Sequence, residues 1–172
     1  KIINSCGNDL LILINDILDI SKIEAGELSI SLSKINLYEL IENLVLDMQP
    51  LANEKGLILN YNSNLNELFL LSDSNRIKQI IRNLMSNAIK FTDNGIIKII
   101  LEENANDITI KVIDEGIGIS KEKLGYIFER FKQADGSTTR KYGGTGLGLA
   151  ISKELASLLG GEIKAFSTLG QG

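Results

Sequence analysis

Three short clusters of residues constrain this chain more than any other feature of its sequence. A helical stretch carries Asn83, Asn87 and Lys90, and two glycine-rich turns follow it at residues 114–118 and 144–148. Amide oxygens and an ammonium group suit a divalent cation beside a phosphate chain, and glycines let the backbone approach a ligand closely. The three clusters together predict one pocket for magnesium and ATP.

The helical stretch is predicted from its apolar residues, which recur three and four positions apart and mark a core-facing stripe. These residues are Ile77, Ile80, Ile81, Leu84, Ala88 and Phe91. Asn83, Asn87 and Lys90 form a second row at positions i, i+4 and i+7, so they face a common neighbour. A solvated helix face would give the same row. Asparagine competes for its own backbone inside helices, however, and two of them one turn apart favour a site.

The first glycine turn follows a predicted strand, because apolar and polar residues alternate over positions 108–113. Asp114 stands at the end of this strand, where its carboxylate can accept an N–H group such as the exocyclic amine of adenine. Gly116 and Gly118 lack the β-carbon that would keep the backbone away from a flat base. An acidic turn with two flexible glycines is the alternative for this cluster taken alone.

The second glycine turn, Gly144-Thr145-Gly146-Leu147-Gly148, runs into a predicted helix that stops at Gly160. The N-terminus of a helix carries unpaired N–H groups and partial positive charge, so it binds phosphate without a side chain. The turn lacks the Lys-Ser/Thr pair of a P-loop, and its GxGxG spacing differs from the Rossmann GxGxxG. The residues expected to face inward are Leu147, Ile151, Leu155 and Leu158.

A basic segment, residues 129–142, lies between the two turns and carries a net charge of +2 in a chain whose net charge is −4. A basic loop beside a phosphate site suits a lid that closes over the polyphosphate. An ordinary surface loop is the alternative, although loops of this length are usually functional or disordered. We expect Arg140 or Lys141 to reach the phosphates, and the sequence does not choose between them.

In their order and spacing these blocks resemble the catalytic, ATP-binding part of sensor histidine kinases, over nearly the whole chain. Residues 80–92 are similar to the N box of that family, residues 114–118 to its first glycine box, residues 128–131 to its F box and residues 144–148 to its second glycine box. The segment 10–26 resembles the end of the second dimerisation helix.

This resemblance implies a role for each matching residue. Asn87 would be the magnesium ligand, Asn83 and Lys90 would assist at metal and phosphate, and Asp114 would hold the adenine amine. The glycine boxes, the aromatic residues of the N and F boxes and the lid would enclose the nucleotide. The residues concerned are Phe91, Gly116, Gly118, Ile119, Phe131, Gly144, Thr145, Gly146, Leu147 and Gly148, with Arg140 and Lys141 in the lid.

The chain contains no histidine, whereas the resemblance implies transfer of phosphate to a histidine on a dimerisation helix. We therefore expect the acceptor outside these 172 residues. Gyrase-type topoisomerases and heat-shock chaperones, which share the ATP fold, typically carry a glutamate one helical turn before the metal asparagine. Asn83 stands at that position and cannot take a proton, so we expect poor intrinsic hydrolysis.

Two other functions stay open at the level of sequence. The chain could be a nucleotide-dependent interaction module, in which ATP orders the lid and alters contacts without phosphoryl transfer. It could also be a hydrolytic ATPase of the wider superfamily. A histidine-bearing helix upstream would support the kinase over the first alternative, and steady ATP turnover by the chain itself would support the second.

Hydrophobic residues make up 44 % of the chain, enough for one well-packed domain and a helical appendage. We predict residues 1–26 as the last helix of a dimerisation domain. Residues 27–172 should form the catalytic domain, an α+β two-layer sandwich with a mixed sheet and helices on one face. Helices are expected at 1–24, 37–54, 74–91, 121–128 and 145–159, and strands at 28–32, 57–62, 67–71, 96–102, 107–113 and 162–166. Pro50 should kink or interrupt the second helix.

The first helix has apolar residues on more than one face, which indicates burial in a four-helix bundle built from two chains. Packing within the same domain is the alternative. Asn15, Asp16 and Asp19 are expected to face outward. A homodimer through this helix, a phosphoacceptor histidine helix and the receiver domain of a response regulator are the partners that the resemblance implies.

Composition argues against several other kinds of protein. The acidic balance argues against nonspecific nucleic-acid binding. Cys6 is the single cysteine, so the chain cannot form an internal disulfide, and a reducing compartment is expected. No segment is long and apolar enough to cross a bilayer. We expect a cytoplasmic domain, with any membrane anchor outside this chain.

Overall fold

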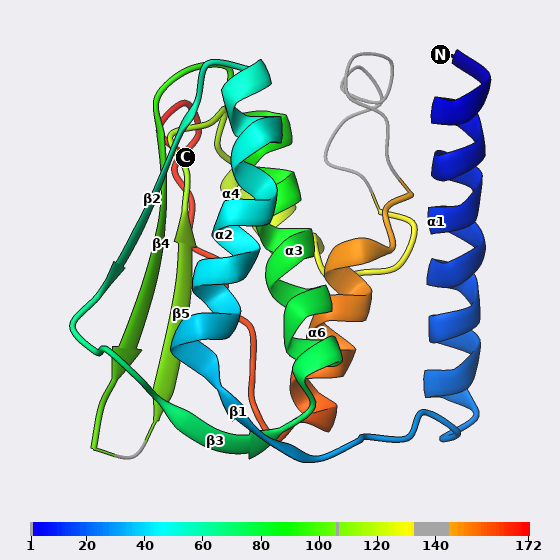
Figure 1. Ribbon diagram of the computed structural model, residues 1–172. Helices are drawn as coiled ribbons and strands as arrows, with labels where there is room; N and C mark the ends of the chain where they lie inside the picture. The colour runs from blue at the N-terminus through cyan, green and yellow to red at the C-terminus, as the bar shows by residue number, and fades with distance from the viewer. Residues whose placement is uncertain (1, 106, 133–144) are drawn as a thin grey trace.

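The structure of the chain, a computed structural model, describes residues 2–105, 107–132 and 145–172. Figure 1 shows helices packed on one face of a mixed sheet, with a long N-terminal helix standing at the side of the helical layer. The predicted α+β architecture of two layers is therefore confirmed.

The helical layer is formed by α2 (Leu37–Glu54), α3 (Ser74–Phe91) and α6 (Gly148–Leu158). Helices α2 and α3 lie over the sheet, α6 packs beside α3, and α1 (Ile2–Glu24) lies along the outer side of α6 (Figure 1). Helix α4 (Lys121–Leu124) is a single turn after the first glycine cluster. The ends of α2 and α3 agree with the sequence prediction.

The main sheet has the strand order β2-β4-β5. Strand β2 (Ile58–Ser63) is parallel to β4 (Ile96–Glu103), and β4 is antiparallel to β5 (Ile108–Ile113). A second, two-stranded antiparallel sheet pairs β1 (Ser33–Asn36) with β3 (Phe69–Ser72). Strand β5 ends at the residue before Asp114, so the sheet places the first glycine turn beside the end of α3.

The core lies between the main sheet and the helices α2 and α3. Buried residues recur every three or four positions on the helices and every second position on β4, as the two geometries require. Each large side chain removed from water stabilises the fold by roughly 1.5–3 kcal/mol. The largest fully buried side chains of this core are Leu37, Ile41, Leu44, Ile81, Met85, Ile97, Ile99 and Leu101.

Two predicted strands are wrong. The segment 28–32 has no strand assignment, and the first strand begins at Ser33. The segment 162–166 is likewise not a strand. A strand needs a neighbour for its ladder of hydrogen bonds, and neither segment pairs with a described strand. Phe166, whose side chain is 87 % exposed, shows how little this second segment packs.

Two smaller expectations differ from the structure. Pro50 does not interrupt helix α2, which is held at both ends by core residues such as Leu37 and Ala52. Leu158 was expected to face inward but is 45 % exposed, since α6 buries only a narrow stripe against α3 and α1. Ile80, Leu84 and Phe91 on α3 are half-buried rather than fully buried.

Candidate functional site

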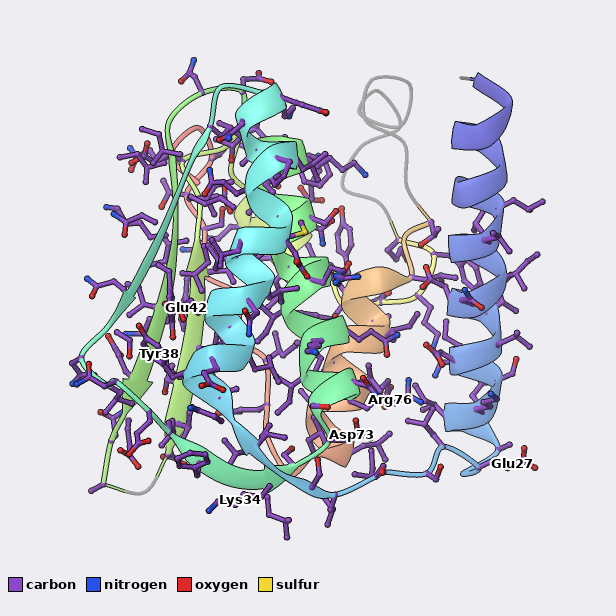
Figure 2. The ribbon with its side chains drawn as sticks, in the orientation of Figure 1. Glu27, Lys34, Tyr38, Glu42, Asp73 and Arg76 are labelled. Atoms are coloured by element: carbon purple, nitrogen blue, oxygen red, sulfur yellow. The ribbon has the colours of Figure 1, made fainter. Side chains whose placement is uncertain are left out.

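Helix α3 is held at its start by Asp73. The Asp73 carboxylate caps the helix by accepting the amide N–H groups of Asn75 and Arg76 at 3.0 and 3.2 Å, and it also accepts that of Ser31 at 2.9 Å. Burial alone would raise the pKa of this carboxyl, but the three amide donors together lower it. Figure 2 labels Asp73 and Arg76 at this end of the helix, where the chain arriving from α1 passes by.

Asn83 lies in the contact between α3 and α6. Its side-chain Nδ2 donates to Ser152 Oγ at 2.8 Å, and Ser152 is almost completely buried. A β-carbon on Gly148 would lie only 2.4 Å from Asn83 Oδ1. Glycine at the first position of α6 therefore allows the second glycine turn to approach the polar row of α3. Sequence reasoning missed Ser152, although a serine one turn after Gly148 within an apolar helix was a visible signal.

Asn87 and Lys90 follow Asn83 on the same row, and both are half-buried. Burial lowers the pKa of the Lys90 ammonium, because the charged form loses contact with water. The Lys90 Nζ atom lies 4.9 Å from the centre of the Phe91 ring. A partly desolvated ammonium one turn from an amide side chain is well suited to an anionic ligand.

The first glycine turn is attached to the last turn of α3 by main-chain contacts. The Ile117 N–H donates to Phe91 O at 3.2 Å, and the Gly116 N–H donates to Asp114 Oδ1 at 2.9 Å. A β-carbon on Gly116 would lie 2.6 Å from Phe91 O, so any other residue would push the turn away. The predicted adenine-binding carboxylate is thereby held next to the end of α3.

The C-terminal segment covers this turn, a contact that the sequence analysis missed. The Ile119 N–H donates to Ser167 Oγ at 2.7 Å, and the Gly170 N–H donates to Ile117 O at 2.8 Å. Gly118 has φ +65°, and a β-carbon there would lie 2.2 Å from the carbonyl oxygen of Thr168. The glycines that end the sequence were the available signal.

A hollow of about 190 Å³ opens beside the first glycine turn. The residues that line it come from the loop between α3 and β4, the turn itself and the C-terminal segment. They are Asp93, Asn94, Glu115, Gly116, Ile117 and Gly170. The hollow adjoins the predicted adenine side and does not reach the second glycine turn.

The second glycine turn meets both α3 and the segment that follows α4. Thr145 Oγ1 accepts the Leu147 N–H at 3.0 Å, and Leu147 is fully buried. Gly146, at φ +71°, accepts the Phe131 N–H through its carbonyl oxygen at 3.1 Å. Phe131 itself has φ +60° and a side chain that is 71 % exposed. Residues 128–131 and the second glycine turn are therefore neighbours in space, which agrees with the prediction that both belong to one site.

The lid prediction falls mainly outside the described residues. Gly144, Arg140 and Lys141 lie in the segment 133–144, so the structure does not place them. Two basic residues of the predicted lid are described. Arg130 forms an ion pair with Glu24 of α1, and Lys132 Nζ lies 3.9 Å from Glu129 Oε2.

The expectation that Asp16 and Asp19 face outward is wrong. The Asp19 carboxylate accepts a hydrogen bond from Gln79 Nε2 at 2.7 Å, and it lies 3.6 Å from the Arg76 guanidinium. Asp16 accepts Thr145 Oγ1 at 3.1 Å. Periodicity within α1 could not show this, because the partners come from α3 and the second glycine turn. Asn15 is exposed, as expected.

Burial raises the pKa of the Asp16 carboxyl, the hydrogen bond from Thr145 opposes this shift, and the charge of Asp19 adds to it. Other side chains of α1 stay in solvent. Leu10, Leu11, Ile14, Ile17 and Leu18 have exposed fractions between 45 % and 59 %. One face of α1 thus docks on α3, α6 and the second glycine turn, and another presents apolar residues to solvent.

Within the described part of the chain, no helix is both long and apolar enough to span a membrane. The described residues also contain no group of three or more His, Cys, Asp or Glu side chains placed to hold a metal ion.

Comparison with known proteins identifies the same region. Residues 72–172 match the family described as "Histidine kinase-, DNA gyrase B-, and HSP90-like ATPase". The chain is 44 % identical over 173 residues to "Autoinducer 2 sensor kinase/phosphatase LuxQ" of Vibrio cholerae, an alignment that covers 98 % of this chain and 20 % of that protein. The chain spans between 9 % and 20 % of the length of the curated relatives that it matches.

Two solved structures share the fold. The crystal structure of full-length ShkA in complex with AMPPNP is 31 % identical, with a TM-score of 0.86, and the match covers 97 % of this chain and 35 % of that chain. Histidine kinase ThkA in complex with response regulator protein TrrA is 26 % identical, with a TM-score of 0.72, and the match covers 94 % of this chain and 45 % of that chain.

Proposed function

The chain belongs to the histidine kinase-, DNA gyrase B-, and HSP90-like ATPase family, and we propose that it is the catalytic domain of a sensor histidine kinase. It would bind ATP with magnesium and transfer the γ-phosphoryl group to a histidine of a dimerisation helix. Since the chain contains no histidine, that acceptor lies outside these 172 residues. The sequence similarity to sensor kinases over nearly the whole chain supports this choice within the family.

The observation that carries the proposal is that α3 touches both glycine turns. Phe91, at the end of the helix, accepts the Ile117 N–H of the first turn. Asn83, two turns earlier, contacts the start of α6 at Ser152 and lies against Gly148. The row Asn83, Asn87 and Lys90 thus runs between an adenine-side turn and a phosphate-side turn.

The residues fit a magnesium–nucleotide complex by their chemistry. Amide oxygens are ligands that magnesium accepts, and phosphate oxygens and water complete its shell. We assign Asn87 as the metal ligand, with Asn83 and Lys90 beside the metal and the phosphates. Asp114 would accept the adenine amine. Bound magnesium would neutralise charge on the transferring phosphoryl group.

The remaining site residues enclose the nucleotide. Positions where a β-carbon would collide with a neighbour, as at Gly116 and Gly148, show that both turns are closely packed. Phe91, Gly118, Ile119, Phe131, Gly144, Thr145, Gly146 and Leu147 complete the assigned set, and Arg140 or Lys141 of the lid would reach the phosphates. Asn83 cannot act as a general base, so the domain should position ATP without hydrolysing it rapidly.

The partners follow from the same proposal. The exposed apolar face of α1 supports a homodimer through this helix. The structure of ThkA with its response regulator supports a receiver domain as the acceptor of the phosphoryl group from the histidine. A division into a dimerisation helix, residues 1–26, and a catalytic domain, residues 27–172, is supported by the helix stop at Gly26, which has φ +68°. Use of ATP supports a cytoplasmic location.

The experiment that tests the function supplies a separate dimerisation hairpin carrying a histidine. Incubation with γ-labelled ATP and magnesium should label the hairpin only when this chain is present. Asn87→Ala should abolish labelling and weaken ATP binding chiefly when magnesium is present. Steady release of phosphate without labelling would instead identify a hydrolytic ATPase, and nucleotide binding with neither outcome would identify an interaction module.

A further inference from the structure

We propose that Lys55 is a positioning residue for the nucleotide site, an inference that rests on the proposed function. Lys55 lies just after α2 and belongs to none of the three sequence clusters. Its Nζ atom donates to the carbonyl oxygens of Ile89, Lys90 and Thr92 at 2.8, 2.9 and 3.2 Å. One side chain thus holds the whole C-terminal end of α3.

The ammonium group of Lys55 suits the carbonyl groups at the end of α3. An ammonium group has three donors and no acceptor, and the last carbonyl groups of a helix have no partners within the helix. Three of these carbonyls converge on one nitrogen atom. The positive charge also lies at the negative end of the helix dipole, where it is stabilising. Lys55 therefore fixes the last turn of α3 in one conformation.

That last turn carries the parts of the site that depend on accurate placement. The Lys90 side chain belongs to the polar row, and its own carbonyl oxygen accepts from Lys55. Phe91 O, between two of the bonded carbonyls, accepts the Ile117 N–H of the first glycine turn. A shift of this turn would move the phosphate-side ammonium and the adenine-side turn together.

The backbone around Lys55 is itself fixed by hydrogen bonds. Its backbone N–H donates to Ala52 O at 3.0 Å, and the Leu57 N–H donates to the same oxygen at 2.9 Å. Gly56, at φ +72°, turns the chain out of the helix in the left-handed conformation that favours glycine. Because Ala52 and Leu57 are buried in the main core, the core positions Lys55, and Lys55 positions the end of α3.

The test compares three variants of this chain by calorimetric titration with AMPPNP and magnesium. Lys55→Met removes the ammonium and keeps the length of the side chain, and Lys55→Arg keeps the charge but spreads its donors over a planar fork. Lys78→Met makes the same chemical change at an exposed position of α3 and is the matched control. Affinity should fall about tenfold in Lys55→Met and about threefold in Lys55→Arg, and should not change in Lys78→Met.

A second readout separates positioning from simple support of the fold. Amide hydrogen exchange at Ile117 should be faster in the nucleotide-free Lys55 variants than in the wild type, at a temperature where both are folded. A lower melting temperature with wild-type affinity and wild-type exchange at Ile117 would overturn the proposal. If Lys55→Met does not fold, the test rests on Lys55→Arg. Wild-type nucleotide affinity together with wild-type amide exchange at Ile117 in that variant would overturn the proposal.

The wild-type titration distinguishes this inference from the function on which it rests. A wild-type chain that binds no nucleotide would contradict the proposed function, and the role of Lys55 would fall with it. A wild-type chain that binds, together with a Lys55→Met variant that binds equally well, would leave the function standing and remove only the role of Lys55.

Discussion

The two glycine turns are joined to α3 in different ways. The first turn is held by the main chain, since the Ile117 N–H donates to Phe91 O and Gly116 leaves no room for a side chain. The second turn meets α3 through a side chain, since Asn83 lies against Gly148 and donates to Ser152 one turn further along α6. Both junctions contact one helix, but only the second can rearrange by rotating side chains.

This difference separates the two ends of the proposed nucleotide. A main-chain junction keeps its geometry unless the backbone moves, so it suits the recognition of a flat, constant base. A junction of side chains can exchange partners, so the second turn can adapt when a polyphosphate arrives. The hydrogen bond from Thr145 also connects the second turn to α1, whereas the described contacts of the first turn are with the end of α3, the start of β4 and the C-terminal segment.

The largest effect is expected for Gly116→Ala. The new β-carbon would lie 2.6 Å from Phe91 O and 2.7 Å from Asp114 Oδ1, and a backbone oxygen cannot rotate away. We expect a loss of about 3 kcal/mol in the free energy of unfolding, measured by urea denaturation. Gly161→Ala, where the nearest atom is 3.6 Å away, is the control. Equal stability of the two variants would contradict the rigid junction.

Asp114→Asn should separate binding from folding. The substitution removes the charge but keeps an oxygen that can accept the Gly116 N–H, so the turn should persist. Loss of the charged acceptor for the adenine amine should cost about 2 kcal/mol, or roughly thirtyfold in AMPPNP affinity. Calorimetry measures the AMPPNP affinity, and circular dichroism checks that the fold is retained. Unchanged affinity would refute the adenine assignment.

Gly148→Ala is the counterpart of Gly116→Ala at the second junction. Its β-carbon would lie 2.4 Å from Asn83 Oδ1, which is closer than any contact at Gly116. The Asn83 amide can rotate away, however, at the expense of its hydrogen bond to Ser152. We expect a smaller loss of about 1–2 kcal/mol by urea denaturation. A loss larger than that of Gly116→Ala would show that the second junction is the more rigid one.

The smallest effect is expected for Asp16→Asn, and it is a gain in stability of the docked helix α1 rather than a loss. Burial raises the pKa of this carboxyl in the docked helix. The docked state therefore binds a proton more tightly, and its electrostatic penalty is present above the raised pKa and is relieved as the pH falls through it. Asp16→Asn keeps an oxygen for Thr145 and removes the penalty. Amide protection of α1 should rise slightly at pH 7.

A pH series provides the check on that sign. In the wild type, protection of α1 should increase as the pH falls from 7 toward the raised pKa of Asp16, and Asp16→Asn should show no such increase. Parallel profiles in the wild type and Asp16→Asn would refute the docking role.

Asp73 should affect stability in the opposite direction. Its pKa is lowered, so its contribution to stability is present above its ordinary pKa and is lost as the pH falls through the lowered value.

Most of the fold could be predicted from sequence because its helices are strongly periodic. Helices α2 and α3 were predicted correctly, since apolar residues three and four positions apart mark both of them. The segments 28–32 and 162–166 were wrongly predicted as strands, because alternation shows that a segment can be a strand and not that a neighbour is available.

The candidate site was only partly predictable for a related reason. The polar row of α3 and the two glycine turns could be found because each is local in sequence. Asp16 and Lys55 could not, since their importance comes from partners far away in the chain, and Ser152 gave only the local signal of a serine within an apolar helix. Asp16 in particular looked like a solvent-facing residue until α1 was placed against the second glycine turn.

The central claim is that one ligand site joins α3 to both glycine turns. The most direct measurement is an NMR titration of this chain with AMPPNP and magnesium, following the backbone amides of Asn87, Gly116 and Leu147. All three should shift along saturation curves with a single dissociation constant. Shifts confined to one turn, or different dissociation constants at the two turns, would contradict the account.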